Sequence, residues 1–175
     1  MNAFYARLYQ TFNKITPLQT DCGKLCRQAC CQNTDADLGM YLFPGEERLP
    51  HSADFLRIAP TELYYLPGKP VFFASCQGQC TRSIRPLACR IFPLTPYLTA
   101  KDVLIVKFDP RATALCPLAQ NYQRSDLDPR FVKAVRHVGR ELVDNAETKP
   151  FLKWLSALLD EETELTAPFF DSNSR

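Results

Sequence analysis

Cysteine is the residue type in this chain with the most chemical potential. The sequence holds 8 cysteines in 175 residues, against 2 histidines and 2 methionines. A thiolate is a soft ligand that selects zinc, copper(I) or iron–sulfur clusters over magnesium or calcium. The cysteines form two groups and one isolated position: Cys22, Cys26, Cys30 and Cys31; Cys76, Cys80 and Cys89; and Cys116. We interpret all eight as candidate metal ligands. Catalytic or sensing dithiols and inert buried thiols are the two alternatives that the composition leaves open.

Two pairs of these cysteines have the spacing of a metal-binding clip. Three residues separate Cys22 from Cys26, and three separate Cys76 from Cys80, with a glycine between the latter two that frees the turn. Thiolate zinc sites commonly separate paired ligands by about two to four residues, and iron–sulfur sites use overlapping spacings. The spacing therefore predicts a thiolate site but does not choose the metal.

The adjacent pair Cys30 and Cys31 suggests more than one metal. Adjacent side chains diverge, so they seldom reach the same ion. If both are ligands, two metals or a multinuclear cluster is the easier geometry.

Two arginines flank the cysteine of the most distinctive segment. Arg90 follows Cys89 directly, and Arg85 precedes it by about one helical turn. A nearby guanidinium favours the charged form of a thiol. It also offsets the net negative charge of a divalent metal held by four thiolates, which is costly to bury without compensation. We predict that Arg85 and Arg90 contact the bound cofactor; ordinary surface arginines are the alternative.

Other polar residues are weaker candidates. Glu46 and Glu47 follow a Pro-Gly pair and could line a site, although a solvated turn is the interpretation we favour. His51 is expected in a solvated loop, and His137 beside the apolar face of a helix. The chain contains no phosphate-binding glycine loop, nucleophile elbow or His-Glu-x-x-His motif.

Helical periodicity places the first cysteine group. Apolar residues at helical spacing predict an N-terminal helix that Pro17 ends: Phe4, Leu8, Phe12 and Ile15. The four-residue intervals from Cys22 to Cys30 put the first cysteines on one face of a second helix, which Thr20 or Asp21 would cap.

Hairpins follow in the middle of the chain. Residues 63–66 and 71–74 read as two strands around a Pro-Gly turn, and the second strand leads into Cys76. A second hairpin is expected around residues 100–102. Its strand at 103–108 is so apolar that we expect both faces to be buried.

The C-terminal third predicts a helical hairpin. Asp128 and Pro129 make a cap and first turn, and apolar stripes follow in the helices expected at about 128–147 and 150–165. We predict one α+β domain over 1–175: a small irregular cysteine-rich metal-binding core with short β-hairpins (about 18–120), an N-terminal helix, and a C-terminal helical hairpin (about 126–166). We expect the segment from Cys76 to Cys116 to return onto the first cysteine group.

Composition limits the classes of protein. The chain is 46% apolar and 23% charged, which favours a folded domain. A net charge of +2 is too small to indicate nucleic-acid or membrane-surface binding. No apolar run is long enough to cross a membrane, and the first residues do not resemble a signal peptide. We therefore expect a cytoplasmic protein, in a reducing compartment where structural disulfides are rare. A metal ion or cluster is its expected partner, with no nucleic acid or membrane; a protein partner stays open.

The cysteine segments together resemble a known family. The resemblance is carried by three pieces: Cys22-Gly-Lys-Leu-Cys26-Arg-Gln-Ala-Cys30-Cys31; Cys76 with Cys80; and Arg85-Pro86-Leu87-Ala88-Cys89-Arg90-Ile91-Phe92-Pro93-Leu94. Over roughly residues 20–118 the chain resembles the YkgJ-type family of cysteine-cluster proteins described as zinc- or iron-chelating. That family usually places two residues between the first cysteines, where this chain has three. The resemblance implies zinc or iron–sulfur binding with no assigned cellular role.

Three functions follow as expectations. The first is a metal-binding protein holding zinc or an iron–sulfur cluster, with a slight preference for the cluster because of the vicinal cysteines and the resemblance. The second is an iron–sulfur-dependent enzyme for methyl transfer or redox work, since a related cysteine group occurs in flagellin lysine methylases. The third is a metal-stabilised protein-interaction module. A closed four-sulfur site would favour the module, and an open, solvent-facing one the enzyme.

Overall fold

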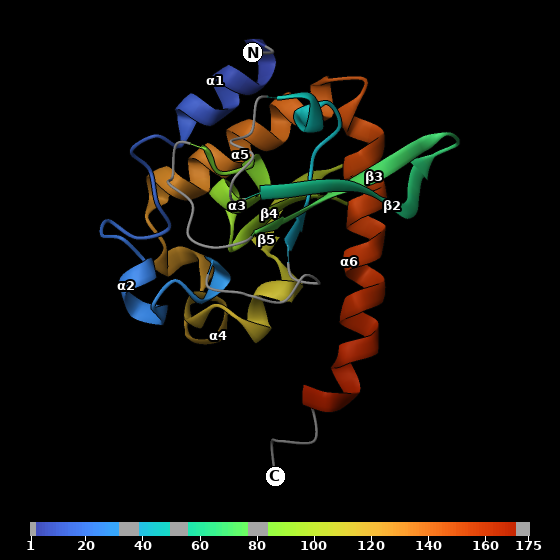
Figure 1. Cartoon of the computed structure of the whole chain (residues 1–175). Helices are drawn as coiled ribbons and strands as arrows, with labels where there is room; N and C mark the ends of the chain where they lie inside the picture. Colours follow the sequence, from blue (N-terminus) through green and yellow to red (C-terminus); the bar gives the residue numbers. More distant parts are fainter. Residues whose placement is uncertain (1–2, 32–38, 50–55, 77–83, 171–175) are drawn as a thin grey trace.

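The chain folds as an α+β protein with an N-terminal helix, two small antiparallel sheets and a C-terminal helical hairpin (Figure 1). The computed structural model describes residues 3–31, 39–49, 56–76 and 84–170, with the side chains of Cys31 and of residues 165–170 left aside. His51 and Cys80 lie outside the described residues. The fold class predicted from the sequence is confirmed at this level.

The helices are α1 (Ala3–Thr11), α2 (Gly23–Cys26), α3 (Leu87–Ile91), α4 (Pro117–Asn121), α5 (Pro129–Asp144) and α6 (Thr148–Phe170). The strands are β1 (Gly39–Tyr41), β2 (Leu56–Leu66), β3 (Lys69–Cys76), β4 (Leu94–Leu98) and β5 (Leu104–Phe108). Short 3₁₀ turns link them: η1 (Ala29–Cys31), η2 (Glu46–Arg48), η4 (Pro110–Ala114) and η5 (Arg124–Asp126).

The first sheet is built on the predicted Pro-Gly hairpin. Its strand order is β1-β3-β2, and both pairings are antiparallel. Gly68, in the turn, adopts φ +70°, a conformation that costs glycine little. In Figure 1 the tip of this hairpin extends past α6. Strand β2 forms one edge of the sheet, and Pro60 lies within it, where the pairing with β3 becomes irregular. Proline is tolerated there because an edge strand leaves some N–H groups unpaired.

Strand β1 was not predicted, because the sequence around it reads as turns. It pairs with β3 through the register Met40 with Ala74. A Cβ atom on Gly39 would lie 2.2 Å from the carbonyl oxygen of Ala74, so only glycine allows this approach. Such a three-residue strand is formed by tertiary pairing and not by its own propensity.

The second sheet is the predicted hairpin of β4 and β5, and it packs against α5 and α6. Gly139 lets α5 approach closely, since a Cβ there would lie 2.9 Å from the Cβ of Pro96. The expectation that β5 is buried on both faces is wrong: Val106 is 1% exposed, whereas Ile105 is 39% exposed. The helices cover one face of this hairpin, and an antiparallel pair can leave its other face to solvent.

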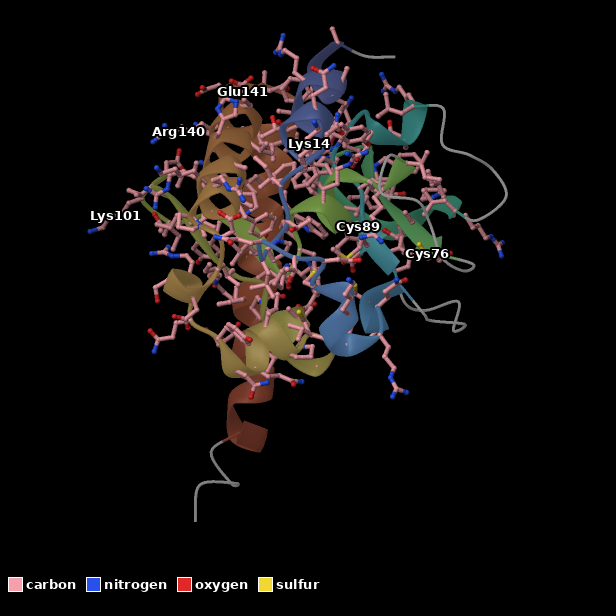
Figure 2. All side chains as sticks on the ribbon, turned by 90° about the vertical axis from the view of Figure 1, so that its left-hand side faces the viewer. Lys14, Cys76, Cys89, Lys101, Arg140 and Glu141 are labelled. Carbon is pink, nitrogen blue, oxygen red and sulfur yellow. The ribbon has the colours of Figure 1, made fainter. Side chains whose placement is uncertain are left out.

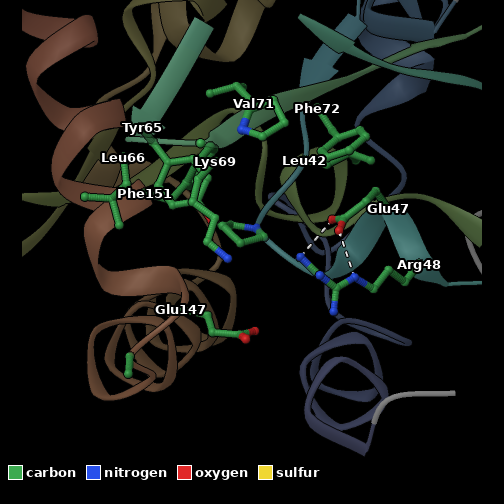
Figure 3. Close-up of a pocket in the computed structure, with 15 residues that line it drawn as sticks. Leu42, Glu47, Arg48, Tyr65, Leu66, Lys69, Val71, Phe72, Glu147 and Phe151 are labelled. Carbon is green, nitrogen blue, oxygen red and sulfur yellow. Dashed lines mark hydrogen bonds and ion pairs between the residues drawn. The ribbon is translucent and has the colours of Figure 1, made fainter.

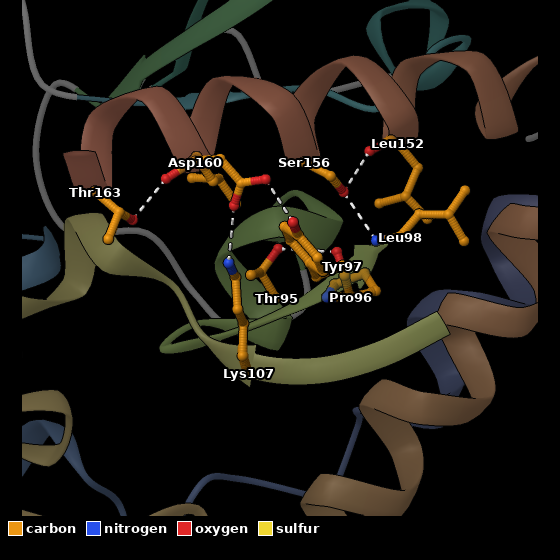
Figure 4. Close-up of polar contacts among 10 residues, drawn as sticks. Thr95, Pro96, Tyr97, Leu98, Lys107, Leu152, Ser156, Asp160 and Thr163 are labelled. Carbon is orange, nitrogen blue, oxygen red and sulfur yellow. Dashed lines mark hydrogen bonds and ion pairs between the residues drawn. The ribbon is translucent and has the colours of Figure 1, made fainter. Parts of the chain in front are cut away.

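Polar contacts attach α6 to β4 (Figure 4). The Oγ of Ser156 donates to the Leu152 carbonyl at 2.8 Å and accepts from the Leu98 N–H at 2.9 Å. One turn further on, Asp160 accepts from the Tyr97 hydroxyl at 2.5 Å and pairs with Lys107 at 3.5 Å. These contacts set the register of the helix along the strand.

The helical hairpin has the apolar interior that its sequence predicts. The α5 stripe is fully buried: Phe131, Val135, Val138 and Leu142. Asp128 caps α5 by accepting from the Arg130 N–H at 2.8 Å, as expected. Helix α1 ends at Thr11, earlier than predicted, yet Phe12 still packs its ring against that of Phe131, with centroids 6.0 Å apart.

No helix in the described part of the chain is long and apolar enough to cross a membrane.

Candidate metal centre

The first cysteines lie on two short turns of helix, where a single longer helix was predicted. Helix α2 ends at Cys26, because Arg27 and Gln28 take left-handed φ values of 50° and 62°. Such residues end a helix by turning the chain out of the helical path. Cys30 follows in η1. The predicted cap at Thr20 or Asp21 is wrong in position: Cys22 is the cap residue of α2 and makes no side-chain cap bond. The Oδ1 of Asp21, one residue earlier, accepts from the Gly23 N–H at 3.0 Å.

Two of the later cysteines lie in or directly before similarly short helices. Cys89 lies in α3 and is half-buried, while Cys116 immediately precedes α4 and is 8% exposed. Figure 2 labels Cys89 and also Cys76, the last residue of β3. A proline starts α4 at its first position and another precedes α3, which suits helix starts that need no N–H.

Five cysteines from distant parts of the sequence line one pocket of about 50 Å³. They are Cys22, Cys26, Cys30, Cys89 and Cys116. The expectation that the later segment returns onto the first cysteine group is therefore confirmed for Cys89 and Cys116. Of the cysteines with described side chains, Cys76 is not among those that line this pocket. The side chain of Cys31, like all of Cys80, falls outside the described part.

The five thiols are not arranged as a coordination shell. Within the described residues, no three His, Cys, Asp or Glu side chains are placed to hold one metal ion. The pocket brings thiol donors to one place, and coordination of one ion would require the sulfurs to lie closer together than they do here.

Burial raises the pKa of two of the pocket thiols, Cys22 and Cys116, and so keeps them neutral. The pKa of Cys22 is raised to about 11, first by burial and then by the nearby Cys30, Asp21, Cys116 and Cys26. Burial also raises the pKa of Cys116, against hydrogen bonds from the Leu118 and Ala119 backbone that lower it. Each thiolate disfavours the next, so a cation among them would stabilise the charged forms.

Arg90 is a buried part of the pocket wall, and the alternative of an ordinary surface arginine is wrong for this residue. It is 3% exposed, and it lines the pocket together with Arg85. Its Nε donates to the Arg85 carbonyl at 2.7 Å and its Nη1 to the Tyr9 carbonyl at 3.2 Å. The guanidinium carbon also lies 4.3 Å from the centre of the Tyr9 ring. These contacts hold a positive charge beside the thiols.

Glu46 is a buried residue that sequence reasoning misjudged. It is 0% exposed, so the solvated turn expected there is wrong for Glu46. Its Oε1 accepts from the Tyr9 hydroxyl and from the Leu87 N–H, both at 2.5 Å, and its Oε2 accepts from the Phe43 N–H at 3.2 Å. One carboxylate thus joins α1, the turn at η2 and the start of α3. The buried apolar pair Leu42 and Phe43 just before the turn was the available signal.

The same contact affects Tyr9. Burial and the neighbouring Glu46 raise the pKa of the Tyr9 hydroxyl, so it stays protonated and donates. Because the Tyr9 ring also lies against Arg90, Glu46 helps to position the arginine at the cysteine pocket.

Comparisons of the chain with protein-family models, with curated proteins and with solved structures return no match. The resemblance to the cysteine-cluster family therefore stays a prediction.

Proposed function

We propose that this protein binds zinc or an iron–sulfur cluster through the thiolates of the cysteine pocket. The observation that carries the proposal is the convergence of five cysteines, from residues 22 to 116, on one small pocket. Soft thiolates select zinc or iron–sulfur clusters over hard cations such as magnesium. The ligands would be drawn from Cys22, Cys26, Cys30, Cys89 and Cys116.

The electrostatics of the cysteine pocket favour the binding of a cation. Burial and the neighbouring sulfurs raise the pKa of Cys22. The thiolate form of Cys22 is therefore unfavourable unless a cation binds beside it. A metal binds the thiolate form and releases the protons. Arg90 lies in the pocket wall, where its charge offsets part of the negative charge that four thiolates leave on a divalent ion.

The site's first role in this proposal is to stabilise the fold. The cysteines of the pocket lie in or directly before helices of four or five residues, or in a 3₁₀ turn. Isolated helices of this length are unstable in water. A metal that joins α2, α3 and the start of α4 would hold these elements in place, as in a metal-stabilised binding module.

One observation favours the alternative of an iron–sulfur-dependent enzyme. Cys30 is exposed to solvent although it lines the pocket. A ligand at the solvent edge would leave one side of the site accessible, and an accessible position distinguishes reactive centres from closed structural ones.

The test is the metal content of the full chain, prepared without oxygen and without chelators. We expect about one zinc ion, or iron with acid-labile sulfide, per chain. Visible charge-transfer absorption distinguishes the cluster from zinc. Metal well below one equivalent would contradict the proposal.

Matched serine variants test the ligand set. Cys89→Ser should lose most of the metal, whereas Cys76→Ser, outside the pocket, should retain it. Arg90→Ala should keep all sulfur ligands and lose metal only partly, under competition with a chelator. Equal loss in Cys76→Ser and Cys89→Ser would show that the pocket does not define the ligands.

A further inference from the structure

A second and larger pocket lies away from the cysteines (Figure 3). It is formed by the β2–β3 hairpin, the turn at η2 and the start of α6, and its volume is about 560 Å³. Pockets for small molecules commonly measure about 300–1,000 Å³ and combine apolar walls with a few polar groups. Here the apolar wall includes Tyr65, Leu66 and Phe151.

Two opposite charges face this space. Figure 3 shows the carboxylate of Glu147 and the ammonium of Lys69 directed into the gap between the hairpin and the turn. Both side chains are exposed, and neither makes an ion pair within 4.0 Å in the described part of the chain. They are therefore available to a ligand.

The remaining charges of the pocket are already engaged. Glu47 pairs with Arg48 at 3.2 Å and accepts from the Gly45 N–H at 2.7 Å. This pair forms the wall opposite Glu147 and contributes no net charge. The pocket thus offers one negative and one positive group to a ligand.

Gly45 lies beside the carboxylate of Glu147. A Cβ built on Gly45 would lie 4.0 Å from the Oε2 of Glu147, and its φ of +89° favours glycine. On the other side, Tyr65 is close enough to Glu47 and Glu147 for both to raise the pKa of its hydroxyl, after burial. The hydroxyl therefore stays a hydrogen-bond donor at the pocket wall.

We propose that this pocket binds a free α-amino acid with an apolar side chain. Glu147 receives the ammonium, Lys69 receives the carboxylate, and the apolar group lies against Tyr65 and Leu66. A purely cationic ligand would meet Lys69, and a purely anionic ligand would meet Glu147, so a zwitterion matches both charges. This site is independent of the metal proposed above.

Calorimetric titration of the full chain with L-phenylalanine tests the proposal. We expect saturable binding, and at least about tenfold weaker binding of phenethylamine and of 3-phenylpropionate, because each lacks one of the two charges. No saturation by L-phenylalanine or L-leucine up to about 10 mM would overturn the proposal. Equal binding of phenethylamine or of 3-phenylpropionate would also overturn it, because one charge would then suffice.

Charge variants locate the binding. Glu147→Gln and Lys69→Gln should each weaken binding of phenylalanine about tenfold, while Glu164→Gln and Lys133→Gln, outside the pocket, should not change it. The double variant Lys69→Glu with Glu147→Lys keeps both charges in exchanged positions, and it should bind more tightly than either single reversal. Circular dichroism confirms the fold of each variant. Wild-type affinity in both pocket variants would overturn the assignment.

Discussion

The helical hairpin and the cysteine pocket are built in opposite ways. On α5, four apolar residues spaced over three turns are 0% exposed, and α6 adds Leu152 and Leu159, which are also 0% exposed. Around the cysteines, α2 has four residues and its Leu25 is 54% exposed. The first region buries apolar surface along long elements, whereas the second gathers polar and thiol groups on short ones.

This difference in buried apolar surface indicates which region can be stable without the other. Burial of a Leu or Phe side chain contributes about 1.5–3 kcal/mol, so the hairpin carries its own stabilisation. The pocket places thiols that burial keeps neutral beside a buried guanidinium, and such groups stabilise a fold only when they are satisfied. We therefore expect the two regions to respond differently to the loss of metal, of apolar contacts and of charge.

Metal removal should have the largest effect. Structural zinc contributes about 10–16 kcal/mol of apparent binding energy, comparable with the whole stability of a domain at about 5–15 kcal/mol. Adding a chelator to the metal-loaded protein should reduce amide-exchange protection in α2, α3 and α4 before it does so in α5 and α6. Equal loss of protection in all five helices would show that the two regions are not distinct.

Phe131→Ala should have the next largest effect, because it opens a cavity where α1 and α5 meet. Phe131 is 0% exposed, and such truncations lower the free energy of unfolding by about 3–5 kcal/mol. Denaturant unfolding of the metal-free chain measures the change. Leu63→Ala, at a residue 40% exposed, is the control and should change it by less than about 0.5 kcal/mol. Similar values for the two variants would contradict the packing of α1 against α5.

Glu46→Gln should lower the free energy of unfolding by about 2–3 kcal/mol. The amide keeps one oxygen but presents an NH₂ group to a donor that now bonds to Glu46, leaving that donor unsatisfied. The effect should be strongest around α3 and should therefore also loosen Arg90. Thermal unfolding and metal retention measure the two parts. Glu47→Gln, which keeps an acceptor for the Gly45 N–H, is the control and should change both much less; an equal effect would argue against the role of Glu46.

Asp128→Asn should have the smallest effect, confined to the start of α5. The Arg130 side chain and N–H lower the pKa of Asp128. A carboxyl whose pKa is lowered by folding stabilises the folded state at a pH above its ordinary pKa. This contribution is lost as the pH falls through the pKa of the folded state. The variant should unfold a few degrees lower at neutral pH, and the difference should vanish well below pH ~4.

The pH dependence has its own check. Arg130→Gln removes the guanidinium, which is the largest cause of the lowered pKa of Asp128, and leaves the backbone N–H in place, so it should reproduce most of the pH dependence. A constant difference between wild type and variant across the pH range would exclude the ion pair as its source.

The regular half of the fold was predictable from the sequence. The stripes from Phe131 to Leu142 and the cap at Asp128 carry their signals locally, and the structure confirms both. Local signals failed where long-range contacts decide. Strand β1 depends on pairing with β3, and the burial of Glu46 depends on donors from residues 9 and 87. The hydrophobic periodicity of a segment gives no information about partners that lie far away in the sequence.

The candidate site was predictable in its residue types but not in its grouping. Spacing shows how closely two cysteines can approach along the chain, and it predicted clips at Cys22 and Cys76. It does not show where each clip points after folding: the residues around Cys22 line the pocket with Cys89, while Cys76 does not. The break at Arg27 and Gln28 was likewise hidden, because neither residue is a glycine.

The proline in strand β2 bears on how copies of this protein behave at high concentration. An open strand edge is a template for pairing with another chain, and this hairpin also exposes Leu63, Tyr64 and Leu66. Pro60 removes one hydrogen-bond donor, and the irregular register between Pro60 and Tyr64 interrupts the flat stretch that an incoming strand would need. Strand β2 thus carries a built-in obstacle to aggregation at the position where its sequence would otherwise promote it.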